Sequence, residues 1–67
     1  MKTEIFDADP FTSRKGQLLL TIESDYRFEK GDEFVIEGDS PQRMRVISVR
    51  LFLRGNSVRR EVVAMRV

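Results

Sequence analysis

The side chains that usually carry enzyme chemistry are scarce in this sequence. It contains neither histidine nor cysteine, so it lacks the usual proton carrier near neutral pH and the thiol nucleophile. A glycine-rich phosphate loop is also missing. Two carboxylates can do acid and base work where burial splits their pKa values, but a chain of 67 residues leaves little room for such a pocket. We therefore expect a protein that is not an enzyme, with no catalytic residues, no cofactor and no small-molecule substrate.

Two pairs of acidic residues could lend oxygen ligands to calcium. They are Asp7 with Asp9, and Glu37 with Asp39. Calcium takes about six to eight oxygen ligands, and neither pair follows the spacing of an EF-hand loop. Ordinary turn chemistry explains both pairs better, so we expect no metal site.

Arginines gather around one aromatic residue near the end of the chain. Arg50, Phe52 and Arg54 alternate, so they share one face of an extended strand, and a turn at Gly55-Asn56 adds Arg59 to that face. Arginine beside an exposed aromatic ring suits phosphate contact with base stacking, which indicates RNA or single-stranded DNA. A structural explanation is that Phe52 covers its neighbours and takes a cation–π contact from Arg59. We favour it, because one aromatic ring on a near-neutral chain is a thin footprint for nucleic acid.

A second basic group is expected at the other end of the same hairpin, on the opposite face. It consists of Arg43, Arg45 and Arg66, and Arg45 and Arg66 are expected to be nearly cross-strand neighbours. Like charges there repel, which could mark a site for an acidic protein surface or a phosphate. Balance by Glu33 and Glu37 is the explanation that we favour.

The charges are divided unevenly along the chain. Residues 1–41 carry five basic and ten acidic side chains, whereas residues 42–67 carry seven arginines and one glutamate, so the net charge is +1. If the two parts lie side by side in one small domain, we expect much of this asymmetry to be neutralised internally.

The elements that must position these residues are β-strands. Residues 43–67 predict one long hairpin, in which the glycine-first loop Gly55-Asn56 suits a type II′ turn. This turn places Leu53 opposite Val58 and, farther along, Val46 opposite Met65.

The apolar residues of the first hairpin strand change sides near Ser48. Met44 and Val46 have one parity, whereas Val49 and the residues after it have the other. A strand that buries opposite faces in its two halves needs a bulge or a sharp coil. A bulge at Arg59-Arg60 is an alternative, and both solutions predict a bent ribbon.

Three shorter strands are expected before the hairpin. They cover residues 2–6, 17–23 and 33–37, and Phe11 is expected to anchor the loop at 7–16 to the core. In the second strand, Leu18, Leu20 and Ile22 are expected on one face. The third strand pairs with the hairpin so that Glu37 faces Arg43.

Together these elements predict a single all-β domain over residues 1–67, a small five-stranded SH3-like or OB-like barrel with a long bent C-terminal hairpin.

Such a small core, without disulfide or zinc, favours self-association. The leading hypothesis is a non-enzymatic interaction module that contacts a protein partner or a second copy of itself. The alternative is nucleic-acid binding through Arg50, Phe52, Arg54 and Arg59. No apolar run reaches membrane-spanning length, so we expect a cytoplasmic protein with no membrane partner.

Overall fold

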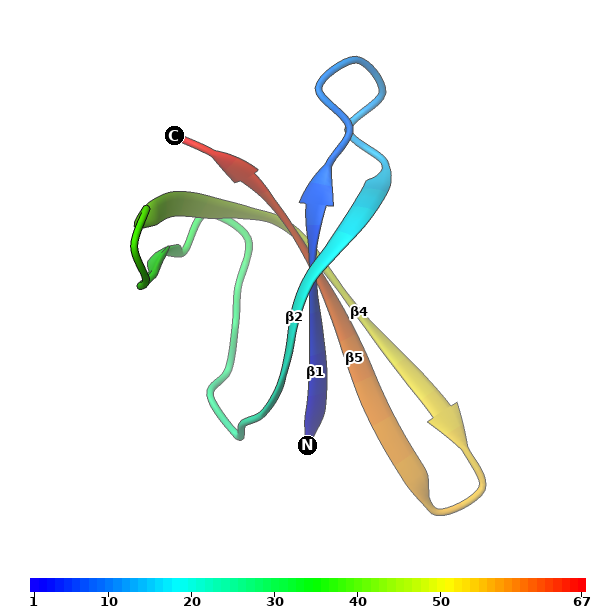
Figure 1. Ribbon diagram of the computed structural model, residues 1–67. Coiled ribbons are helices and arrows are strands. Elements are labelled where there is room, and N and C mark those ends of the chain that lie inside the picture. The colour runs from blue at the N-terminus through cyan, green and yellow to red at the C-terminus, as the bar shows by residue number, and fades with distance from the viewer.

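The computed structural model describes residues 1–67 and consists of five strands without a helix (Figure 1). The strands are β1 (Lys2–Ala8), β2 (Lys15–Glu23), β3 (Glu33–Ile36), β4 (Gln42–Arg54) and β5 (Ser57–Arg66). They form one sheet in the order β2-β1-β5-β4-β3, in which β1 and β5 pair in parallel and all other neighbours are antiparallel. The predicted all-β class and the five strands are confirmed. The structure has no helix that is long and apolar enough to span a membrane.

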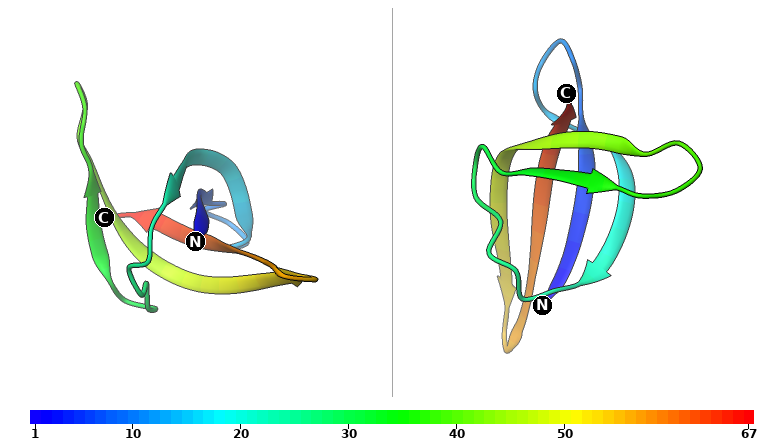
Figure 2. Two further views of the ribbon diagram at one scale, coloured as in Figure 1. Left: turned by 90° about the horizontal axis from the view of Figure 1, so that it is seen from below. Right: turned by 90° about the vertical axis from the view of Figure 1, so that its left-hand side faces the viewer.

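The sheet is strongly curled, as Figure 2 shows, and β3 with the first part of β4 lies across the other strands. This half-barrel is consistent with the small SH3-like or OB-like barrels that the sequence predicts. Its two edge strands, β2 and β3, do not pair with each other. We call the side of the sheet that carries Ile5, Val46 and Val62 the inner face, and the other side the outer face.

The β4–β5 ribbon bends at a bulge. Leu53 pairs with Val58, as predicted, and this register continues to Ser48 and Val63. It then shifts at Ile47, so that Val46 pairs with Ala64 and the predicted pairing with Met65 is wrong. The bulge next to Ser48 is the device that lets both halves of β4 bury their apolar side chains. The alternative bulge at Arg59-Arg60 is ruled out, because the β4–β5 ladder is regular there.

The β3–β4 hairpin differs from its predicted register by two residues. Ile36 pairs with Gln42 and Phe34 with Met44, so the predicted pairing of Glu37 with Arg43 is wrong. A shift of two residues keeps every side chain on its expected face, because side chains alternate with a period of two. The apolar pattern therefore could not distinguish the two registers.

The β1–β2 hairpin contains two further irregularities, and the first lies between the pairs Ile5–Leu20 and Phe6–Leu18. Because Ile5 and Phe6 point to opposite faces, Leu18 leaves the face of Leu20, and its side chain is exposed. The prediction that Leu18 and Leu20 share a face is therefore wrong.

The loop before β2 has no anchor in the core. Phe11 is 94% exposed, which contradicts the anchoring role expected for it. Asp9 organises this loop instead, because its Oδ1 atom accepts hydrogen bonds from the backbone amides of Phe11 at 2.8 Å and Thr12 at 3.2 Å. This use of Asp9 is ordinary turn chemistry.

The core on the inner face is small. Ile5, Val46 and Val62 are almost completely buried, and the side chains packed against them are Leu19, Leu20, Ile22, Phe28, Phe34 and Val49. Only 10 of the 67 residues are buried, so each core contact accounts for a large part of the stability.

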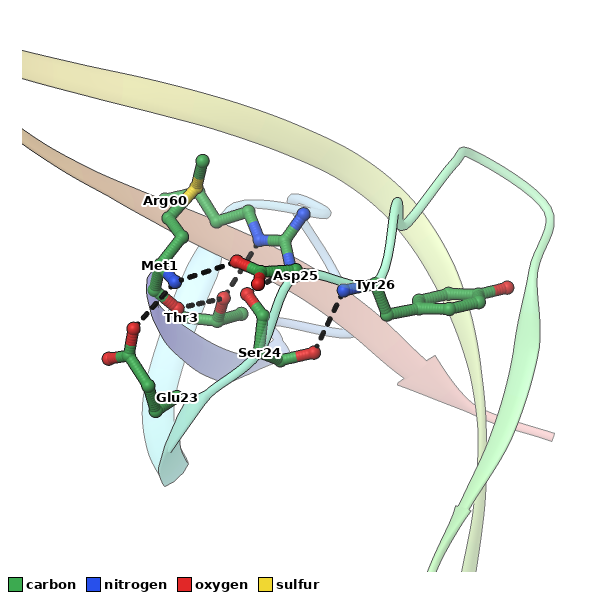
Figure 3. A network of polar contacts seen from close by, with 7 residues as sticks. All are labelled: Met1, Thr3, Glu23, Ser24, Asp25, Tyr26 and Arg60. Carbon is green, nitrogen blue, oxygen red and sulfur yellow. Dashed lines mark hydrogen bonds and ion pairs between the residues drawn. The ribbon is translucent and has the colours of Figure 1, made fainter.

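A buried arginine, Arg60, ties the start of the segment after β2 to the sheet, and Figure 3 shows its contacts with Thr3 and Ser24. The Nε atom of Arg60 donates a hydrogen bond to Thr3 Oγ1 at 2.8 Å, and its Nη2 atom donates one to the carbonyl oxygen of Ser24 at 3.2 Å. The guanidinium also lies over the ring of Phe28, 5.0 Å from the ring centroid. Arg60 has no acidic partner, so hydrogen bonds and the aromatic ring must compensate for the burial of its charge.

Candidate functional site

The outer face is organised around Glu61, which lies on the central strand β5. Its side chain is only 10% exposed, and its carboxylate contacts two cations. Arg59 Nη1 lies 2.7 Å from Glu61 Oε2, and Lys15 Nζ lies 3.1 Å from Glu61 Oε1. Arg59 Nη1 also lies 3.0 Å from Oε1 of Glu4 on β1. The network therefore joins β1, β2 and β5, and it neutralises part of the charge asymmetry between the two parts of the chain.

These contacts shift the protonation equilibria of the network. Burial raises the pKa of Glu61, but the hydrogen bonds from Arg59 and Lys15 outweigh it and leave the pKa below its ordinary value. The hydrogen bond to Glu61 raises the pKa of Arg59. Both shifts favour the charged forms, as expected for an ion-pair network.

Each cation of the network also lies against an aromatic ring. The guanidinium carbon of Arg59 is 4.2 Å from the ring centroid of Phe52, and Lys15 Nζ is 4.7 Å from that of Phe6. The cation–π contact that the sequence suggested for Phe52 and Arg59 is thus present. It covers part of the Phe52 ring and fixes its orientation.

Two hollows flank Phe52 on the outer face. The first has a volume of about 660 Å³ and is lined by Ser13, Arg14, Lys15, Ser48, Arg50, Phe52, Glu61 and Val63. The second has a volume of about 450 Å³ and is lined by Lys2, Phe52, Leu53, Arg54, Ser57, Val58 and Arg59. Phe52 belongs to both, so the two hollows form one track with an aromatic ring at its middle.

Four cations of this track have no ion pair. They are Lys2, Arg14, Arg50 and Arg54. The structure therefore keeps all four residues of the predicted surface on the track but divides their roles. Arg50 and Arg54 are free to meet a ligand, whereas Arg59 is held by Glu4 and Glu61.

The second predicted basic group comes together only in part. The guanidinium of Arg45 lies 3.0 Å from Glu33 and that of Arg43 lies 3.9 Å from it, so Glu33 takes the balancing role expected for it, whereas Glu37 forms no ion pair. Arg66 pairs with the buried Met44, whereas Arg45 pairs with Met65. Arg66 thus lies on the other face from Arg43 and Arg45, because the bulge at Ile47 changes the register.

Sequence reasoning missed Lys2, Arg14 and Lys15 as members of the track. All three precede the hairpin by more than 25 residues and reach it because β1 pairs in parallel with β5. No local pattern in residues 1–15 could have indicated this. The sequence contained one relevant signal. Glu61 is the single acid in residues 42–67, which indicates that cations lie beside its carboxylate.

No protein-family model, no curated protein and no solved structure matches this chain. What the site does must therefore be inferred from its own geometry and charge.

Proposed function

We propose that this protein is a small non-enzymatic interaction module whose outer face binds RNA or single-stranded DNA. The observation that carries the proposal is the track around Phe52, in which four cations without ion pairs flank one aromatic ring. Positive side chains that follow a groove with an aromatic ring are the usual means by which small barrels hold a single strand.

The distribution of charge supports this function. Arg43 and Arg45 share the carboxylate of Glu33, whereas Arg50 and Arg54 form no ion pair. Arg50 and Arg54 are four residues apart on one strand, which corresponds to roughly 13 Å. The cations therefore form an extended row suited to a polyanion, and not a single point that would suit a small ion.

A second candidate function is contact with a protein or with a second copy of the chain. The observation that favours it is the projecting tip of the β4–β5 hairpin, where Leu51 is 56% and Leu53 is 73% exposed (Figure 1). Light scattering after size exclusion, from micromolar to millimolar concentration, tests self-association. A strict monomer over this range would remove self-association from this candidate.

The nucleic-acid proposal is tested by fluorescence anisotropy with short RNA and single-stranded DNA oligonucleotides at two salt concentrations. We expect affinity to fall as salt rises, because bound phosphates release counterions. The variant R50A/R54A should bind more weakly and with a salt slope reduced by about 1 to 2. The matched control R43A/R45A removes the same charge from two arginines that lie outside the track and contact Glu33, and it should retain most of the affinity.

Two outcomes contradict the proposal. One is the absence of salt-sensitive binding to any oligonucleotide. The other is an equal loss in R50A/R54A and R43A/R45A, which would show a response to net charge rather than a site. Circular dichroism of each variant confirms that it is folded before its affinity is compared.

A further inference from the structure

We infer that the first hollow binds the terminal phosphate of the strand, a phosphate monoester, in preference to an internal phosphodiester. This inference rests on the proposed function and assigns one end of the ligand to one end of the track. It makes the protein a reader of phosphorylated strand ends.

The hollow is built from segments that are distant in sequence. Ser13 and Arg14 come from the loop before β2, Lys15 is the first residue of β2, and Ser48 and Arg50 belong to β4. Strands β1 and β5 lie between these segments in the sheet and set their separation. A ligand in the hollow would therefore be approached by cations from two sides.

The charge of the hollow matches a phosphate monoester. Its lining contains three cations and one carboxylate, which leaves a net charge of +2. A phosphate monoester carries about −1.5 to −2 at pH 7, whereas each internal phosphodiester carries a single negative charge. The monoester is thus the form of phosphate that the hollow can neutralise most completely.

Glu61 does not oppose an anion in this hollow. Its Oε1 atom is held by Lys15 at 3.1 Å and its Oε2 atom by Arg59 at 2.7 Å, so both oxygens are already occupied. Arg14 and Arg50 remain without an ion pair, and the hydroxyls of Ser13 and Ser48 have no hydrogen-bond partner. Two guanidinium groups and two hydroxyls are donors suited to a phosphate with three terminal oxygens.

Phe52 separates this hollow from the second one, where Lys2 and Arg54 lie. A strand whose end occupies the first hollow would place its first base against Phe52 and its next phosphates near Lys2 and Arg54. The second hollow contains no acidic residue, so it suits phosphodiesters of any sequence.

The test compares otherwise identical fluorescein-labelled oligonucleotides with a 5′-phosphate, with a 3′-phosphate and with neither, by anisotropy against the full chain. We expect one terminal phosphate to increase the affinity about tenfold, the equivalent of one charge-assisted hydrogen bond. R14A/R50A should bind the phosphorylated and unphosphorylated strands equally. The matched control K2A/R54A should weaken binding of all strands while keeping the preference.

Equal binding of all three oligonucleotides to the wild type would overturn the inference and leave the proposed function intact. If no oligonucleotide binds, the proposed function fails, and NMR titration with inorganic phosphate then examines the hollow alone. Amide shifts at residues 13–15 and 48–50 that are lost in R14A/R50A would support a phosphate site. No shifts at these residues would reject it.

Discussion

Glu4 on β1 and Glu61 on β5 lie directly opposite each other in the parallel ladder, and Arg59 Nη1 bridges their carboxylates at 3.0 and 2.7 Å. Two like charges in this position would repel each other without the guanidinium between them. Arg59, which the sequence places among the ligand-binding candidates, is thus an internal counter-ion. Its contact with Phe52 then links the ion-pair network to the candidate binding track.

The substitution R59M should lower the urea midpoint of unfolding, because it leaves Glu4 without a counter-ion and Glu61 with Lys15 alone. Adding E4Q to R59M should restore part of the loss, since it removes one of the two charges. Equilibrium urea unfolding of the two single variants and the double variant measures this coupling. R43M, which removes an exposed arginine 3.9 Å from Glu33, is the control and should change the midpoint little. Additive effects of R59M and E4Q would argue against the bridge.

Glu61 should make stability depend on pH in the acidic range. Its pKa in the folded protein is lower than its ordinary value, so its contribution is complete above the ordinary pKa and is lost as the pH falls through the lowered value. We therefore expect the wild type to be more stable than E61Q at pH 7, with a difference that shrinks as the solution is acidified. Urea midpoints of both proteins measured from pH 7 to pH 3 give this difference. An offset that does not change with pH would contradict the lowered pKa.

The small core makes the protein sensitive to single cavities. Ile5 is 2% exposed and packs with Val46 and Val62, so I5A should cost about 2 to 5 kcal/mol. A chain of this size has a total stability of about 3 to 10 kcal/mol, so this loss would leave a marginal fold. L53A removes an apolar side chain that is 73% exposed and should stay within about 0.5 kcal/mol of the wild type. Urea unfolding measures the free energy of unfolding of both variants. Equal losses in I5A and L53A would contradict the placement of Ile5 in the core.

The tip of the β4–β5 hairpin requires glycine at its first turn position. Gly55 has a φ of 58°, a value that an alanine adopts only with strain, so G55A should cost about 1 to 2 kcal/mol. Gly38 lies in another loop, with an ordinary φ and no neighbouring atom within 4 Å of the place that an added methyl group would take. G38A should therefore be neutral or slightly stabilising. Thermal unfolding of both variants provides the comparison, and a G55A variant as stable as G38A would be incompatible with the observed turn.

The sequence by itself determined the all-β class, the turn at Gly55-Asn56 and that the long hairpin must bend, while the structure chose the bulge next to Ser48 over the one at Arg59-Arg60. These follow from neighbouring residues, because a two-residue turn and the alternation of apolar side chains are local properties. For the same reason the row Arg50, Phe52 and Arg54 could be placed on one face from the sequence. A register shift of two residues, as between β3 and β4, leaves that alternation unchanged and could not be seen.

Only the tertiary structure decided what lies beside that row. The parallel pairing of β1 with β5 brings Glu4 to Glu61, and the β1–β2 hairpin then brings Lys15 to the same carboxylate. The bulge at Ile47 places Arg66 on the face of Met44, so Arg66 is separated from Arg43 and Arg45. Pairing between distant strands depends on how the whole sheet buries its apolar side chains, and no short stretch of sequence contains that information.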